Sequence, residues 1–246
     1  MTVKQKVSIS TSTSTIYPSR RPNLRVFDIT ADAFLALPNF GTSFFYAFSG
    51  TQYAKVNFSS DKVETGPHWI TYWGTFSKAD FGRVDAIVGV PNEPNQFYAF
   101  YGGQYFRAKI DSSGNDSFVN SAPKSIASEW PGLVEAGFNT VDAGVVNPSY
   151  PDYIYFFSGT MTLKYSWSKS EVIWGPKLIT DGWPCLEKAG FDPVDAIVQK
   201  PETKHVYYVF RGNKYVRINW DGHENATIGR NTDLIKEQWQ SLRAWV

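Results

Sequence analysis

The chain has a single cysteine, Cys185, among its 246 residues, so no disulfide can form within it. Secreted β-domains of this size usually carry at least one disulfide, and the lack of one favours a reducing compartment such as the cytoplasm. No run of 18 apolar residues is present, and no transmembrane helix is expected. The Ser/Thr-rich start lacks the apolar segment of a secretory signal.

Charge is also scarce, at 19% of residues, and the net charge is +1. Residues 1–27 carry +5, which leaves −4 on the remainder. A weakly acidic body without a Lys/Arg stripe argues against partnership with nucleic acid or an anionic membrane. Residues 1–25 predict a disordered, basic leader. An organelle transit peptide and an edge strand offered to a partner are the alternatives for this segment.

Catalytic motifs are missing as well. The chain has no Gly-x-Ser-x-Gly, no His-Glu-x-x-His, no phosphate-cradling glycine loop and no Cys/His cluster. Cys185 follows Trp183-Pro184 and is expected to be half-buried and structural. We therefore expect a protein that is not an enzyme.

Aromatic residues are abundant, at 17%, and 14 Pro and 19 Gly accompany them. This composition favours an all-β fold with many short strands and tight turns. The length allows one large domain with a substantial core.

A four-fold internal repeat dominates the sequence. Asp-Ala pairs recur at spacings of 53, 57 and 53 residues, and an aromatic-x-Gly element follows each pair. Each unit ends in a short predicted helix with a tryptophan: Trp73, Trp130, Trp183 and Trp239. Repeats of this length with several strands each indicate a propeller or an array.

Residues 84–110 illustrate one unit. Residues 84–90 are nearly all apolar, as in a strand buried on both faces, and residues 105–110 alternate as in a half-exposed strand. Gly102 and Gly103 are expected to supply positive φ to the turn between the second and third strands. A short, polar fourth strand is predicted at 116–121. Such a sheet cannot bury both faces alone, but four arranged radially cover one another.

These motifs resemble hemopexin repeats, through the Asp-Ala openings, the Phe-x-Gly-x-x-Tyr hairpins, Gly175-Pro176-Lys177 and the Trp-Pro-x-Leu elements at Trp130 and Trp183. The resemblance covers residues 26–246 and implies a four-bladed β-propeller, each blade having four antiparallel strands and a short helix. The blades are expected at about 26–76, 77–133, 134–186 and 187–246. A lone propeller without a disulfide looks like plant albumin-2 seed proteins and photopexin-like proteins. Packing of the 239–246 end against the first blade must then close the ring.

The resemblance implies two rings of ion-binding groups on the central axis. Backbone carbonyls of Asp32, Asp85, Asp142 and Asp195 would ring a cation, and groups of Phe34, Ile87, Gly144 and Ile197 would ring a second ion, often an anion. Four carbonyl oxygens and waters suit Ca²⁺ or Na⁺. The alternative is that the Asp residues cap strand ends and accept turn hydrogen bonds, with any ion incidental. The family also implies polyamine binding, as a slim cation entering the channel.

Haem is a second candidate ligand, with His68, His205 and His223 as the available iron ligands. None has a partner at a ligating spacing, so a homodimer interface would have to supply the second ligand. His68 occupies the position of Lys124 and Lys177 in other units and reads as a solvated blade-edge residue.

The sequence therefore predicts a propeller that binds a small cationic or planar ligand, with a metal ion in the channel. A carbohydrate-binding, lectin-like role or a storage albumin is the alternative. For glycan binding, the aromatic residues of the rim loops are candidates: Tyr150, Tyr153, Trp167 and Trp174.

Overall fold

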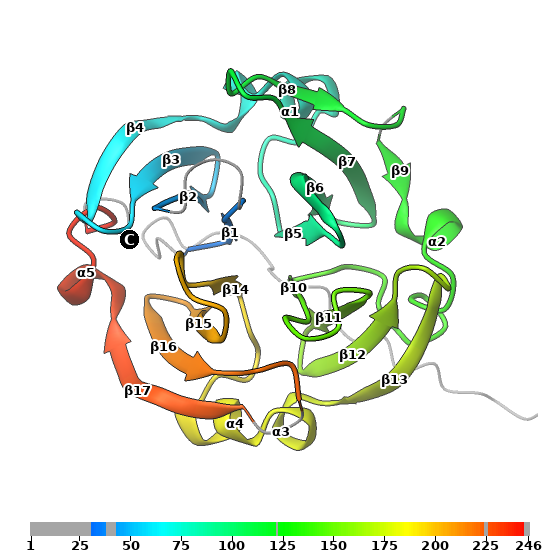
Figure 1. The fold of residues 1–246 in the computed structure, drawn as a ribbon. Coiled ribbons are helices and arrows are strands. Elements are labelled where there is room, and N and C mark those ends of the chain that lie inside the picture. The colour runs from blue at the N-terminus through cyan, green and yellow to red at the C-terminus, as the bar shows by residue number, and fades with distance from the viewer. Residues whose placement is uncertain (1–30, 38–42, 122, 224–225, 244–246) are drawn as a thin grey trace, which may run out of the picture.

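The computed structural model describes residues 31–37, 43–121, 123–223 and 226–243. The predicted leader at residues 1–25 lies outside the described residues. Four antiparallel sheets stand around one axis, each with its strands in sequence order from the centre outward (Figure 1). The predicted four-bladed propeller is therefore confirmed. None of the helices in the described part of the chain is long and apolar enough to cross a membrane.

The first two blades differ at their outer edge. Blade one contains β1 (Ala33–Leu35), β2 (Phe44–Ser49), β3 (Gln52–Asn57) and β4 (Lys62–Trp69), followed by η2 (Ile70–Tyr72) and α1 (Gly74–Lys78). Blade two contains β5 (Ala86–Val90), β6 (Glu93–Tyr101), β7 (Gln104–Ile110), β8 (Asp116–Phe118) and β9 (Lys124–Ser125), followed by α2 (Ile126–Glu129). Its outer strand is split, because β8 and β9 both pair with β7.

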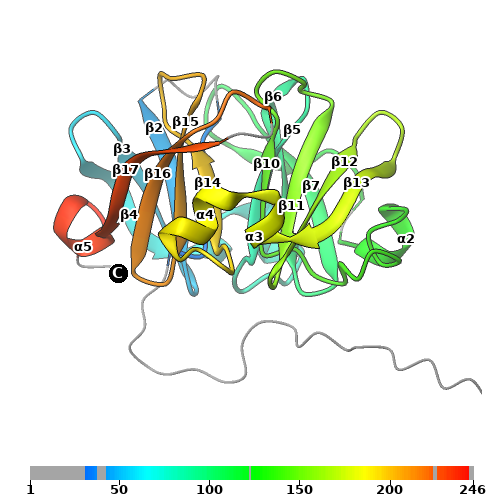
Figure 2. The same ribbon diagram turned by 90° about the horizontal axis from the view of Figure 1, so that it is seen from below.

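Blades three and four keep long outer strands. Blade three contains β10 (Ala143–Val146), β11 (Tyr153–Ser158), β12 (Met161–Ser166) and β13 (Glu171–Leu178), followed by α3 (Ile179–Gly182) and α4 (Pro184–Ala189). Blade four contains β14 (Ala196–Gln199), β15 (Val206–Arg211), β16 (Lys214–Asn219) and β17 (Thr227–Leu234), followed by α5 (Ile235–Gln238). The short helices lie at the outer rim (Figure 2).

The inner strands owe their apolar sequences to their surroundings. β1 and β10 each contact both β5 and β14, so the four inner strands form a closed ring around the axis. Ala86, Ile87 and Val88 of β5 are accordingly all buried. A strand walled on both faces gains from apolar side chains on both, as predicted.

The hairpin between the second and third strands turns at a glycine in every blade. Gly50, Gly102, Gly159 and Gly212 have φ between +54° and +56°, a conformation that costs other residues about 1–2 kcal/mol. Gly103 does not share this conformation, so the expectation that both glycines of the pair supply positive φ was wrong. One left-handed residue per turn suffices.

Tryptophans at the blade ends join each blade to the next. Trp73 meets Phe97 of blade two edge-on, with ring centroids 5.9 Å apart. Trp130 contacts Phe156 of blade three at 5.5 Å, and the ring of Trp183 lies 5.0 Å from that of Trp220 in blade four. Such aromatic pairs contribute about 0.5–1.5 kcal/mol beyond the area they bury.

The fourth tryptophan closes the ring. Trp239 contacts Phe45 and Phe58 of blade one, with ring centroids 5.6 and 5.8 Å away. The Asp61 carboxylate accepts hydrogen bonds from the backbone N–H groups of Gln240 and Ser241, at 2.6 and 3.2 Å. The prediction that the chain end packs against blade one is confirmed for residues 239–243, and residues 244–246 lie outside the description.

The contact between Trp239 and blade one leads to a prediction about stability. We expect Trp239→Ala to lower the free energy of unfolding by about 3–5 kcal/mol, because the 7% exposed indole leaves a cavity between blades one and four. Trp69→Ala is the matched control, since this indole is 54% exposed and its loss should cost less than about 1 kcal/mol. Denaturant titration of both variants, followed by far-ultraviolet circular dichroism, makes the comparison. Equal losses would show that the closing tryptophan has no special part in stability.

Candidate functional site

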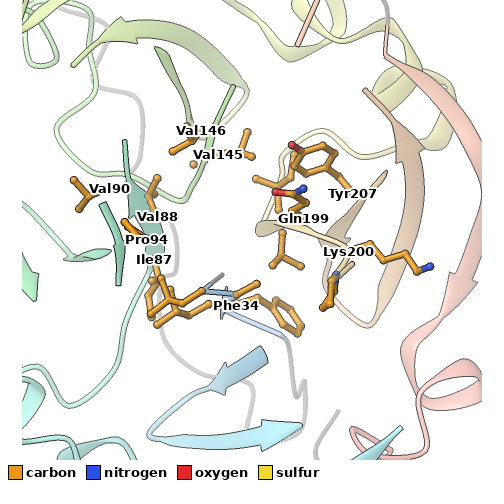
Figure 3. A pocket seen from close by; sticks show the side chains of 18 of the residues that line it. Phe34, Ile87, Val88, Val90, Pro94, Val145, Val146, Gln199, Lys200 and Tyr207 are labelled. Atoms are coloured by element: carbon orange, nitrogen blue, oxygen red, sulfur yellow. The ribbon is translucent and has the colours of Figure 1, made fainter. Parts of the chain in front are cut away.

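The ends of the inner strands enclose a cavity at one mouth of the central channel. Its volume is about 820 Å³, and it is lined by β1, β5, β10 and β14 together with the turns that follow β5 and β14. Aliphatic side chains form most of its wall, among them Val88, Val145 and Val146 (Figure 3). A concave, largely apolar site of this size suits a small organic molecule.

The second predicted ring converges on this cavity. Phe34, Ile87, Gly144 and Ile197 all line it, one from each inner strand. Gly144 is required by packing, because a Cβ atom there would lie 2.6 Å from Cγ2 of Val88. These four positions thus lie around one cavity with an apolar wall, and their binding of a second ion stays a prediction.

The four Asp residues that open the inner strands do not line the cavity. Each carboxylate accepts a hydrogen bond of 2.6–2.7 Å from the N–H of the turn glycine in its own blade: Asp32 from Gly50, Asp85 from Gly102, Asp142 from Gly159 and Asp195 from Gly212. The backbone N–H of each Asp donates to a phenylalanine carbonyl of the second strand. The carboxylates therefore brace the hairpins, which is the alternative role predicted for them.

Any axial ion would consequently need main-chain oxygens. In the part of the chain that the structure describes, no three His, Cys, Asp or Glu side chains gather to hold a metal ion. Each inner strand is the edge of its sheet, so one side of its backbone faces the axis rather than another strand. That edge is where oxygen ligands for a hard cation would come from.

Two glutamates mark the cavity rim from blades two and four, which stand on opposite sides of the axis (Figure 1). Glu93 accepts a 2.9 Å hydrogen bond from Gln96 and lies 3.8 Å from the Arg107 guanidinium. Glu202 accepts a 2.7 Å hydrogen bond from Ser43. The negative charge of Glu93 is therefore partly offset by a neighbouring guanidinium, whereas Glu202 is bonded to a neutral hydroxyl.

Two lysines also belong to the rim, and neither is engaged with the cavity as a charged partner. Lys200 extends away from it in Figure 3 and places its ammonium 5.4 Å from the centroid of Phe58. Lys204 also belongs to the rim and is exposed.

The structure does not bring the three histidines to the cavity. His68 lies on β4, opposite Tyr53, in the register position that Lys124 and Lys177 hold in blades two and three, as predicted. His205 and His223 are exposed in turns of blade four. None of the described residues that line the cavity is a histidine.

The aromatic residues proposed for sugar stacking are mostly committed to packing. The Trp167 indole donates a 2.9 Å hydrogen bond to the Tyr98 hydroxyl, and Trp174 packs against the core of blades three and four. Tyr150 is 48% exposed and packs on Tyr153. Sequence reasoning missed Trp69 and Tyr72, whose exposed fractions of 54% and 67% depend on the local path of blade one.

Cys185 is buried in α4, where burial raises the pKa of its thiol to about 11. The thiol therefore stays protonated and unreactive at neutral pH. The predicted structural role fits this environment.

The four sheets and the axial cavity define a four-bladed β-propeller. No protein-family model matches the sequence. Among characterised proteins, albumin-2 of Lathyrus sativus is 25% identical over 208 residues, which covers 80% of this chain and 90% of that protein.

Solved structures agree with this resemblance. A lectin with two metal-binding sites from Cicer arietinum is 25% identical, with a TM-score of 0.78 over 89% of this chain and 98% of its own. A hemopexin-fold protein from cow pea is 21% identical and has a TM-score of 0.78 over 87% and 97% of the two chains. The resemblance to plant albumin-2 and hemopexin-fold proteins is confirmed.

Proposed function

We propose that this propeller is a non-enzymatic binding protein that holds a small cationic or planar molecule in the cavity at the channel mouth. The cavity itself is the observation that carries the proposal. Its aliphatic walls would desolvate a flat or slim apolar body, and four blades supply them from rigid strands. A preorganised site of this kind loses little entropy when it is occupied.

The rim supports a positive charge on the ligand. Glu202 carries this argument, because Glu93 already lies beside Arg107. Of the two rim lysines, Lys200 is directed outward and Lys204 is exposed. A polyamine or a planar organic cation would place its charge beside Glu202 and its carbon skeleton on the aliphatic wall. Haem fits this cavity less well, because none of the described lining residues is a histidine that could ligate the iron.

A cation on the axis belongs to the same proposal. Main-chain oxygens of Asp32, Asp85, Asp142 and Asp195 would hold Ca²⁺ or Na⁺, since their carboxylates are already bonded within the blades. The similar lectin from Cicer arietinum has two metal-binding sites, which supports the binding of a metal ion by this chain. A bound cation would offset the mutual repulsion of four carbonyl dipoles and join the blades at the centre.

Glycan recognition is the second candidate, favoured by the similarity to that lectin. In this chain Tyr72 stacks on His68 with centroids 5.5 Å apart, and Trp69 is exposed beside them. Exposed aromatic faces of this kind can stack on the apolar face of a sugar.

A pair of dyes tests ligand binding in the cavity. Nile blue and Nile red are similar planar dyes, cationic and neutral respectively, and we expect both to bind, with Nile blue favoured. Val146→Trp should reduce both affinities more than about 10-fold by filling the cavity, whereas Ile173→Trp on the outer strand β13 should not. Glu202→Gln should weaken Nile blue alone, about 2–5-fold. Spermine competition then measures polyamine binding. If the dye affinities are unchanged by Val146→Trp, the dyes bind outside this cavity.

Calcium addition tests the axial ion. At about 100 times its dissociation constant, Ca²⁺ should raise the free energy of unfolding by about 2.7 kcal/mol, and EDTA should reverse the effect. Thermal unfolding with Ca²⁺, Na⁺ and EDTA, with Mg²⁺ as the control cation, measures this. An unchanged melting temperature in all four conditions would count against an axial cation.

Erythrocyte agglutination and a glycan array test the second candidate. If the blade-one aromatics bind sugar, Tyr72→Ala should reduce glycan affinity about 10-fold, and Val146→Trp should leave it unchanged. Absence of glycan binding by the wild-type chain would remove this candidate and leave the cavity proposal intact.

A further inference from the structure

Tyr207 is a polar residue in the apolar wall of the cavity. It lies on β15, opposite Gln199 of β14, and its side chain is 1% exposed. Its ring packs against that of Trp220 in a T-shaped contact, with centroids 5.4 Å apart. Figure 3 shows the phenol in the cavity wall with its hydroxyl end directed toward Val145.

The hydroxyl of Tyr207 makes no hydrogen bond to another described residue. Among the described residues, none donates a hydrogen bond to it or accepts one from it, and burial is the one cause that raises the pKa of the phenol. The Tyr207 oxygen is not one of the fully buried polar atoms that lack a partner in the described structure, because it is open to the cavity. Its hydrogen-bonding capacity is therefore directed at whatever occupies the cavity, water or ligand.

The internal repeat shows that the fold does not require this hydroxyl. Five residues before the turn glycine, the other blades carry Phe45, Phe97 and Ile154, which are 0–3% exposed. Three of four blades thus pack an apolar side chain at the same position. Only blade four has a hydroxyl at this position, and its tyrosine lines the cavity.

Neighbouring polar groups of the wall are already engaged. The Gln199 amide donates to the carbonyls of Thr203 and Lys204, and the Gln96 amide donates to Glu93 and accepts from Arg107. Tyr207 therefore offers a donor that no described group of the protein uses.

We propose that Tyr207 is the hydrogen-bonding residue of the cavity and that its ligand carries an acceptor oxygen or nitrogen on an otherwise apolar, ring-sized body. This inference rests on the proposed binding function of the cavity. The Tyr207 hydroxyl would donate to the acceptor, and the aliphatic walls would exclude water from that bond. Selectivity would follow, since a ligand without an acceptor would leave the donor unpaired.

The test uses 1-indanone and indane, two bicyclic molecules that differ by one carbonyl acceptor, as competitors of Nile red. Tyr207→Phe reproduces the residue that blade two holds at this position. We expect it to weaken indanone about 3–10-fold and to leave indane unchanged. The melting temperature of the unliganded variant should be equal to or above that of the wild type, because no internal hydrogen bond is lost. Tyr208→Phe, which alters the neighbouring tyrosine that packs on Trp239, is the matched control and should change neither affinity.

The outcomes separate the two proposals. If Nile red fails to bind, or binds equally well to Val146→Trp, the cavity is not a ligand site and both proposals fail. If Nile red binds in the cavity but Tyr207→Phe weakens indanone and indane alike, or neither, the role of Tyr207 is overturned and the binding function stands. A drop in melting temperature for Tyr207→Phe would show that the hydroxyl serves stability instead.

Discussion

Aromatic contact between neighbouring blades is the interaction on which this ring depends. Each sheet has two apolar faces and covers neither by itself, so each must press against the next. Trp73, Trp130, Trp183 and Trp239 fill these junctions, and all four are buried. The first three junctions are between blades that follow one another in sequence. The fourth brings residues about 180 to 195 positions apart into contact and is held entirely by noncovalent bonds.

The architecture could be predicted from the sequence because each motif of the repeat determines its own local structure. Periodic Asp-Ala pairs, turn glycines and tryptophans each have a conformational reason that needs no distant partner. Details set by the backbone path were harder to predict. Gly103 follows Gly102 without sharing its conformation, and the outer strand of blade two divides into β8 and β9. Both depend on how a particular turn meets its neighbours.

The candidate site was predictable in position but not in character. Phe34, Ile87, Gly144 and Ile197 converge on the axis because four equivalent strands do. That the space between them is an apolar cavity depends on side chains from all four blades at once. Tyr207 gave no signal in the sequence, since a tyrosine among aromatic strands looks like any core residue until its surroundings are known. The three histidines attracted attention by their chemistry, yet they lie away from the cavity wall.

Phe34 belongs to two parts of the molecule at once. It lines the cavity, and its ring stacks on Phe210 across the junction of blades one and four, with centroids 4.2 Å apart. A molecule bound in the cavity would therefore rest on a contact that joins the first blade to the last. By thermodynamic linkage, occupancy and closure must favour each other to the same degree, so a ligand would act as a clasp for a propeller that has no disulfide.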